Sequence, residues 1–223
     1  MIKALIFDFD GTLSNRTANA YDIYYDSLKP YFPDFDEIEY EAMLQDLMYY
    51  DCNGTISMDV RMYAFMAKYG DHLPKTFISD YAAFYVKHMY EYTNLQKETA
   101  EVLEKLKGAY KLGLLSNGDP FSQHHKIEHT GVGKYFDEII VSGDLGIHKP
   151  DQKIFELMAE KLCVDCSECM MIGDVFSSDI LGAYRAGMVP VWVCKDSDKK
   201  AKNYKGYRIF DLKELFAILE LTV

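Results

Sequence analysis

The sequence predicts an α/β fold in which a parallel sheet carries helices on both faces and a helical segment interrupts the chain after the first strand. Three observations predict it. An apolar run opens the chain at 2–7, helical periodicity fills 14–92, and helices alternate with strands from about 96 onward. Such alternation is typical of a parallel sheet, because each crossover returns the chain along one face. A length of 223 residues fits one larger domain with an insertion.

The first strand is expected at Ile2 to Phe7, before the turn-forming residues Asp8-Phe9-Asp10-Gly11. Four amphipathic helices should follow, at 17–31, 36–50, 57–69 and 75–91. Pro33-Asp34, Asn53-Gly54 and Gly70-Asp71 separate them. No convincing strand occurs in that stretch.

The rest of the chain should complete the sheet. Helices are expected at 96–107, 120–130, 151–163, 177–186 and from about Leu212. Strands are expected at 110–115, 138–142, 169–172, 189–194 and near 207–210. Ligands bind beyond the carboxyl ends of the strands in such sheets, so polar residues just after each strand are the candidates for function.

The charge balance bears on the kind of partner. There are 24 basic and 35 acidic residues, which gives a net charge of -11, and the lysines are scattered along the chain. This argues against binding a nucleic acid polymer through a broad basic face. A small phosphorylated metabolite is still a suitable ligand, because local N–H groups and one or two lysines decide phosphate binding.

The N-terminal apolar run is too short for a signal peptide, and no segment approaches a membrane span of about 18 apolar residues. No membrane association is therefore expected, and a cytoplasmic location is the default prediction. The five cysteines are interpreted as reduced thiols. This includes Cys163, Cys166 and Cys169, whose spacing resembles a metal site but has no fourth cysteine nearby.

Four predicted strand ends carry polar residues that could converge. They are Asp8 and Asp10, then Ser116-Asn117-Gly118, then His148-Lys149-Pro150, and finally Gly173-Asp174 with Asp179. Each group alone fits a helix cap or a turn. Together they fall where an open parallel sheet builds its site.

The residue types point to a divalent cation and phosphate chemistry. Asp8, Asp10 and Asp174 would put about three negative charges in one pocket, which is costly without a neutralising cation. Oxygen ligands of this kind suit Mg²⁺. Asp8 could then attack phosphorus to form an aspartyl-phosphate, while Asp10 protonates the leaving group and later activates water.

The other polar groups would hold the phosphate. The Ser116 hydroxyl and the N–H groups of Asn117 and Gly118 could bind its oxygens, and Lys149 could supply positive charge. Asp179 is expected to fix Lys149 or a metal-bound water, and Thr12 is likewise expected to contact the residues that bind metal and phosphate and not the ligands themselves. The histidines at 124, 125 and 129 are interpreted as solvated residues of a helix, and His148 is the histidine expected near the pocket.

These motifs resemble those of the haloacid dehalogenase-like hydrolases. Asp8-Phe9-Asp10-Gly11-Thr12-Leu13 matches the first motif of that family, Leu115-Ser116-Asn117-Gly118 the second, Lys149-Pro150 the third, and Gly173-Asp174 through Asp179 the fourth. The resemblance implies a Rossmann-like core and a phosphatase with Asp8 as nucleophile and Asp10 as acid/base. It also implies that Asp8, the Asp10 carbonyl and Asp174 bind magnesium.

The resemblance further implies a helical cap domain at 14–94, inserted into a core formed by 1–13 and 95–223, with hinges near 14–18 and 90–96. The cap would close over the pocket and select the substrate. The layout resembles the branch that contains pyrimidine nucleotidases and phosphoglycolate or sugar-phosphate phosphatases. The cap type and its aromatic content motivate the hypothesis of a small phosphomonoester, such as a nucleoside monophosphate or a sugar phosphate, as substrate. The sequence indicates neither the oligomeric state nor the pathway.

Three alternative functions stay open. A carbon–halogen dehalogenase shares the nucleophile, but its relatives lack the second aspartate, so Asp10 argues against it. A phosphomutase of the beta-phosphoglucomutase type would keep both Asp8 and Asp10. A non-catalytic regulatory protein could use the same scaffold, although every proposed catalytic position here carries a competent residue.

Overall fold

The computed structural model describes residues 1–194 and 201–220 of the chain. It divides the chain into two compact units. The core unit comprises Met1–Ser14 with Leu95–Val223, and the helical unit comprises Asn15–Asn94. Among the described residues, no helix has the length and apolar character needed to cross a membrane.

The core unit is built on one six-stranded sheet in the order β3-β2-β1-β4-β5-β6, and all neighbouring strands pair in parallel. Its strands are β1 (Ala4–Phe7), β2 (Lys111–Ser116), β3 (Glu138–Val141), β4 (Cys169–Gly173), β5 (Val189–Val193) and β6 (Tyr207–Ile209). β1 and β4 are buried along their whole length, as expected for strands covered on both faces. The predicted α/β fold is confirmed.

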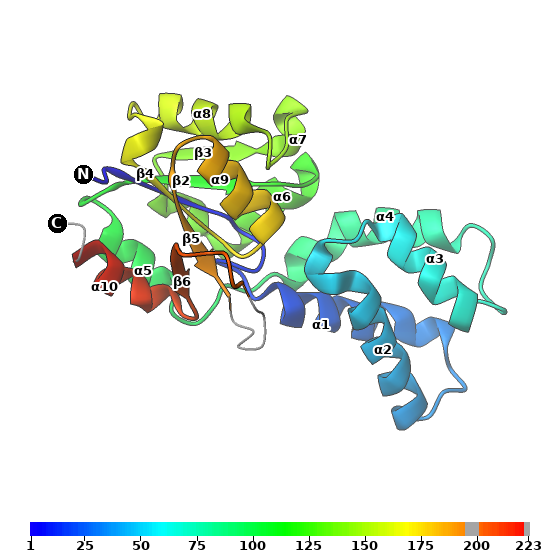
Figure 1. Cartoon of the computed structure of the whole chain (residues 1–223). Coiled ribbons are helices and arrows are strands. Elements are labelled where there is room, and N and C mark those ends of the chain that lie inside the picture. Colours follow the sequence, from blue (N-terminus) through cyan, green and yellow to red (C-terminus); the bar gives the residue numbers. More distant parts are fainter. Residues whose placement is uncertain (195–200, 221–223) are drawn as a thin grey trace. The chain divides into compact units, whose positions relative to one another are not determined.

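Helices cover both faces of this sheet (Figure 1). They are α5 (Thr99–Leu106), α6 (Pro120–Thr130), α7 (Ser142–Leu145), α8 (Gln152–Lys161), α9 (Leu181–Arg185) and α10 (Leu215–Glu220). Shorter 3₁₀ turns occur at Val132–Tyr135, Cys166–Glu168 and Leu212–Glu214, and a π-helical turn occurs at Phe176–Ile180.

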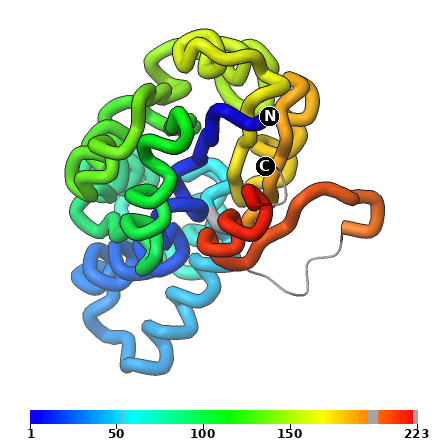
Figure 2. Tube along the Cα trace, turned by 90° about the vertical axis from the view of Figure 1, so that its left-hand side faces the viewer, coloured from blue at the N-terminus to red at the C-terminus, as the bar shows by residue number. Residues whose placement is uncertain are grey.

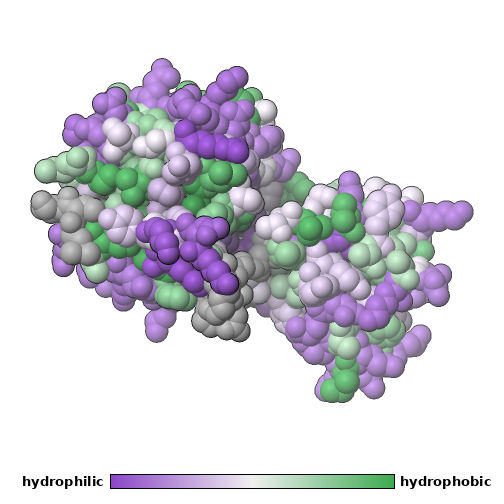
Figure 3. Space-filling view, in the orientation of Figure 1, coloured by the Kyte–Doolittle hydropathy of each residue, from purple (hydrophilic) through white to green (hydrophobic). Residues whose placement is uncertain are grey.

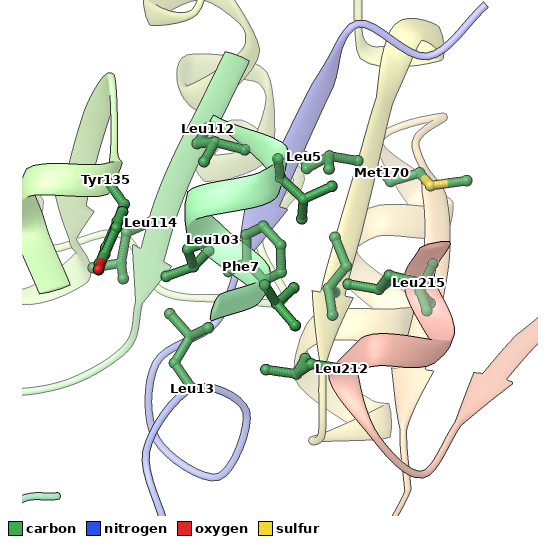
Figure 4. Close-up of a cluster of buried hydrophobic side chains, with 14 of the residues drawn as sticks. Leu5, Phe7, Leu13, Leu103, Leu112, Leu114, Tyr135, Met170, Leu212 and Leu215 are labelled. Carbon is green, nitrogen blue, oxygen red and sulfur yellow. The ribbon is translucent and has the colours of Figure 1, made fainter. Parts of the chain in front are cut away.

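Alternate side chains of the strands build two hydrophobic layers. Leu5 and Phe7 point to the face packed by Leu103 of α5 and Leu215 of α10 (Figure 4). Ala4 and Ile6 belong to the opposite layer, which α8 and α9 cover with residues such as Phe155 and Ala183. This alternation follows from the period of two along a strand, and it fixes the register that aligns the strand ends.

Helix α6 is set by local chemistry at both ends. The Asp119 side chain accepts a hydrogen bond from the Ser122 N–H, and Pro120 occupies the first turn. Gly131 ends the helix in the left-handed conformation, with φ of 63°. The inner face of α6 carries Gln123 and Lys126 beside Ile127, all buried.

The helical unit contains α1 (Arg16–Leu28), α2 (Glu37–Asp51), α3 (Met58–Tyr69) and α4 (Phe77–His88), which Figure 2 follows in chain order from blue to cyan. Short 3₁₀ turns lie at Lys29–Tyr31, Cys52–Gly54 and Met89–Tyr92. Its own core is rich in aromatic residues, including Tyr24, Phe65 and Phe77. The four predicted helices of this stretch are confirmed.

Two details of the core unit differ from the sequence-based expectation. The segment expected as one helix at 177–186 is a π-helical turn followed by α9. The short helix α7 directly after β3 was not expected.

Over the face visible in Figure 3, apolar patches are interspersed with hydrophilic residues.

Candidate functional site

The carboxyl ends of three adjacent strands bring the first polar residues together. Phe7, the last residue of β1, pairs with Leu114 of β2 and with Ile172 of β4. Asp8 follows directly, and its N–H donates to the carbonyl of Ile172 at 2.9 Å. The central position of β1 therefore places Asp8 between the polar residues that follow its two neighbours.

Three carboxylates from two segments of the core unit form one cluster. Asp8, Asp174 and Asp179 each offer an oxygen, and these oxygens lie within 4.8 Å of one another. Asp8 and Asp179 are buried, and Asp174 is partly buried. Asp179 belongs to the π-helical turn after β4, and a π turn of this kind is frequent at functional sites.

Lys149 inserts a positive charge among these carboxylates. Its ammonium nitrogen lies 2.7 Å from Asp8 Oδ1 and 2.7 Å from Asp179 Oδ1. It also donates to the carbonyl of Leu115 at 2.8 Å. The residue is buried, so these charge-assisted interactions act with little solvent screening.

Burial, together with the mutual proximity of these charges, shifts the pKa values of Asp8, Asp174 and Lys149. Burial raises the pKa of Asp174 to about 7, and the charge of Asp179 adds to that rise. Burial also raises the pKa of Asp8, with Lys149 opposing and the neighbouring carboxylates reinforcing the rise. Burial alone would lower the pKa of Lys149, but Asp179 and Asp8 outweigh it and raise that pKa. Negative charge is thus in excess at this site.

The donor set fits a hard divalent cation. All ligands in the cluster are carboxylate oxygens, which Mg²⁺ prefers. Burial and neighbouring carboxylates disfavour the charged forms of Asp8 and Asp174, and a divalent cation would favour them. Among the described residues, no other group of three or more His, Cys, Asp or Glu side chains is placed to bind a metal ion. In particular, Cys163, Cys166 and Cys169 form no such group.

The carboxylate of Asp10 has different neighbours from that of Asp8. It accepts a hydrogen bond from Gln123 Nε2 at 2.8 Å and pairs with Lys126 Nζ at 2.9 Å. The Ser14 hydroxyl lies 3.5 Å from its other oxygen. Its carboxylate is not a member of the three-residue cluster. The sequence analysis expected the side chains of Asp8, Asp10 and Asp174 to share one pocket, but Asp179 takes the place of the Asp10 side chain in the cluster, because Asp10 is bound to α6.

Sequence reasoning missed Gln123 and Lys126. They are three positions apart, so they share one face of α6. The signal was available in principle, because two long polar residues share the inner face of an amphipathic helix with Ile127. Without a known partner, however, such residues look like the solvated edge of that face.

Two hydrogen bonds join the loop after β2 to the backbone of Lys149. Asn117 Oδ1 accepts from the Lys149 N–H at 2.9 Å, and Asn117 Nδ2 donates to the Lys149 carbonyl at 2.9 Å. Ser116 is buried beside it. The Gly118 N–H already donates to Ser142 Oγ at 3.1 Å. Binding phosphate through the Gly118 amide, as predicted, would require that bond to be given up.

The remaining predicted residues lie around this loop and the cluster. The Thr12 hydroxyl is 3.4 Å from Asp174 Oδ1. His148 Nδ1 lies 2.7 Å from Ser142 Oγ, so His148 contacts the serine that binds the Gly118 amide. The structure therefore brings Asp8, Lys149, Asp174 and Asp179 together, with Asp10 held separately.

Comparison with known proteins gives consistent results. The family model described as haloacid dehalogenase-like hydrolase matches residues 2–187. A glyceraldehyde 3-phosphate phosphatase of Pyrococcus abyssi is 29% identical over 200 residues, which cover 86% of this chain and 81% of the relative. The pyrimidine 5'-nucleotidase YjjG of Escherichia coli is 37% identical over 93 residues, or 41% of each chain. The solved structure of a HAD phosphatase from Thermococcus onnurineus covers 98% of both chains, with 28% identity and a TM-score of 0.66.

Proposed function

This chain belongs to the haloacid dehalogenase-like hydrolases, and from that premise we propose that it is a magnesium-dependent phosphomonoester hydrolase with Asp8 as its nucleophile. It is a phosphatase that acts on phosphorylated metabolites, as do the relatives named above. The finer assignments of metal, residue roles and substrate are parts of the proposal.

One observation supports the proposal most directly. Asp8 Oδ1 lies 2.7 Å from Lys149 Nζ, and Asp8 shares a cluster with Asp174 and Asp179 whose oxygens are within 4.8 Å of one another. A carboxylate in such a cluster can approach an anionic phosphate only when cations offset the repulsion. Lys149 supplies one positive charge, and the cluster can hold a divalent ion that supplies two more.

In the first step, a carboxylate oxygen of Asp8 attacks the phosphorus, and the bond between phosphorus and the leaving oxygen breaks. Asp10, as a carboxylic acid, gives its proton to that oxygen, and an aspartyl-phosphate is left on Asp8. In the second step, Asp10 takes a proton from a water molecule that attacks the phosphorus. The bond to Asp8 breaks, and inorganic phosphate leaves.

Magnesium, held by Asp8, Asp174 and the carbonyl of Asp10, would neutralise negative charge on the carboxylates and on the phosphate. Lys149 would bind phosphate oxygens, together with Ser116 and the amide of Asn117, and the Gly118 amide would join them by giving up its bond to Ser142 Oγ. Asp179 would fix the Lys149 ammonium, to which it is already paired at 2.7 Å, and Thr12 would orient Asp174.

The helical unit, 15–94, is assigned the role of a cap that closes over the site and selects the substrate. This assignment is supported by its insertion after the first strand and by its aromatic core. The substrate is proposed to be a small phosphomonoester, either a sugar phosphate or a nucleoside monophosphate. The names of the relatives, a glyceraldehyde 3-phosphate phosphatase and a pyrimidine 5'-nucleotidase, span the same two classes.

Hydrolysis of p-nitrophenyl phosphate with and without Mg²⁺ tests the chemistry. Mg²⁺-dependent release of phosphate is expected, with no detectable activity in Asp8→Asn and wild-type activity in Glu104→Gln, which alters an exposed carboxylate on α5. A panel of sugar phosphates and nucleoside monophosphates then identifies the substrate class. Full activity in Asp8→Asn, or isomerisation of a sugar phosphate without phosphate release, would contradict the proposal.

A further inference from the structure

We propose that Lys126 and Gln123 are positioning residues for Asp10, which hold its carboxylate at the point from which it exchanges a proton with the leaving group. The inference rests on the proposed function, in which Asp10 is the acid/base. It concerns α6, an element to which neither the family motifs nor the metal cluster assigns a role.

The contacts to Asp10 are several and short. Lys126 Nζ lies 2.9 Å from Asp10 Oδ2 and 3.2 Å from Oδ1, so the ammonium bridges both oxygens. Gln123 Nε2 donates to Oδ2 at 2.8 Å. A carboxylate fixed by two donors in this way cannot rotate about its terminal torsion without losing hydrogen bonds.

Both holding residues are buried at a cost. Lys126 and Gln123 are each only 5% exposed. Gln123 Oε1 is buried without a hydrogen-bond partner within the described part of the chain. Burial of an ammonium and of an unsatisfied amide oxygen is unfavourable, and an apolar residue would pack this face of α6 as Ile127 does. The arrangement stabilises one particular orientation of Asp10 more than it stabilises the fold.

The loop after β2 has a glycine at the position where it lies against Gln123. Gly118 has φ of 150°, and a Cβ added to it would lie 2.6 Å from Gln123 Nε2. Gln123 Nε2 also lies 3.4 Å from the Asn117 carbonyl. The loop predicted to bind phosphate and the group that holds Asp10 are therefore adjacent, so a fixed Asp10 would lie near the phosphoryl group whose leaving oxygen it protonates.

The fixed carboxylate remains accessible. The Asp10 side chain is 20% exposed, whereas that of Lys126 is 7% exposed. A leaving group can therefore reach the Asp10 carboxylate more readily than the Lys126 ammonium. Lys126 thus acts through Asp10 and does not contact the substrate. The effect of losing Lys126 on kcat/KM should therefore be larger for a leaving group that must be protonated.

Leaving groups distinguish this role from a structural one. An alkyl phosphate, such as glycerol phosphate, expels a basic alkoxide unless it is protonated, whereas p-nitrophenyl phosphate expels a stable phenolate. The ratio kcat/KM covers the steps up to departure of the leaving group. A misplaced Asp10 should therefore lower kcat/KM for the alkyl ester and spare the aryl ester.

The test measures kcat/KM for both esters in Lys126→Met, Gln123→Leu and Lys126→Arg, with Lys105→Met as the control for loss of an exposed lysine. For Lys126→Met, we expect a loss of roughly tenfold to a hundredfold on glycerol phosphate and of less than about threefold on p-nitrophenyl phosphate. Gln123→Leu should show the same selectivity with a smaller loss. Lys126→Arg, which keeps the cation, should recover part of the alkyl activity.

Equal losses on both esters, or no loss on either, would overturn the inference and leave the proposed function standing. If Lys126→Met fails to fold, Gln123→Leu and Lys126→Arg provide the same comparison. Asp8→Asn must abolish hydrolysis of both esters. Should the wild-type protein hydrolyse neither ester, the proposed function fails, and this inference fails with it.

Discussion

The ammonium nitrogen of Lys149 lies 2.7 Å from Oδ1 of Asp8, although 141 positions separate the two residues in the sequence. The same nitrogen is paired with Asp179. One buried cation thereby joins the carboxylate after β1 to the turn after β4. Loss of that cation should affect both catalysis and folding.

Lys149→Met is expected to lower kcat/KM by on the order of 10²- to 10³-fold, because it removes the positive charge that is proposed to bind the phosphate. It should also destabilise the protein by about 3–5 kcal/mol, since Asp8 and Asp179 are left buried without their cation. Steady-state kinetics and urea unfolding measure the two effects. Lys153→Met, at an exposed position on the adjoining helix α8, is the matched control. Near-wild-type kinetics in Lys149→Met would contradict its assigned role.

Gly11 is expected to tolerate no side chain, because a Cβ there would lie 2.8 Å from Cγ of Asp174. Its φ of 90° adds backbone strain for any other residue. Gly108 has nearly the same φ, 89°, but a Cβ there would meet no atom within 4 Å. Gly108→Ala should thus cost only the strain, about 1 kcal/mol, while Gly11→Ala should cost more and also reduce activity by displacing Asp174. Equal effects of the two substitutions in thermal unfolding and kinetics would refute this.

The sequence predicted the parts of the site that depend on strand position. Asp8 and Asp174 follow neighbouring parallel strands, so the sheet alone brings them together. Lys149 and Asp179 were expected nearby because they come within a few residues of the ends of the third and fourth of the predicted strands. All of these depend on chain positions that a strand pattern fixes.

The parts that could not be predicted depend on tertiary partners. Burial of Lys126 could not be predicted from the helix pattern, because a buried ammonium is unfavourable without a partner such as Asp10. Likewise, the Gly118 amide looks available in the sequence, but α7 places Ser142 Oγ within 3.1 Å of it. The division of 177–186 into a π turn and α9 also has no local signal, because both conformations suit the same amphipathic pattern.

Magnesium is expected to stabilise the protein more at high pH than at low pH. The folded protein without metal holds Asp174 with a pKa of about 7, above the ordinary value of about 3.9 for the unfolded chain. Such a raised pKa contributes stability at low pH that is lost as the pH rises through 7, and the deprotonated carboxylate is also the form that binds metal. The rise in Tm on replacing EDTA with Mg²⁺ should therefore be larger near about pH 8 than near about pH 5.5. The rise should be greatly reduced in Asp174→Asn, and an equal rise at both pH values would contradict the metal assignment.

Thiol reactivity is expected to divide the five cysteines by burial. Cys52 and Cys163 are exposed, whereas Cys169 and Cys194 are buried. Burial raises the pKa of Cys169 to about 12, with Cys166 adding to the rise, so the reactive thiolate is scarce. Titration with a chromogenic disulfide should show a fast phase from Cys52 and Cys163 and slow reaction of the buried pair. Protection of Cys163, Cys166 and Cys169 together by added Zn²⁺ would instead indicate a metal site that the described geometry does not support.

The helical unit should depend on one buried carboxylate for its stability. Asp51 is fully buried and accepts hydrogen bonds from Arg16 Nη2 at 3.1 Å and from the Tyr24 hydroxyl at 2.9 Å, and it is also paired with Arg61. Asp51→Asn keeps the shape but removes the charge that balances two guanidinium groups, so a loss of about 3–5 kcal/mol is expected. Asp46→Asn removes a carboxylate from the surface pair with Lys68 and should cost no more than about 1 kcal/mol. Urea unfolding measures both variants, and a similar small loss in each would show that the two arginines do not need Asp51 as their counter-charge.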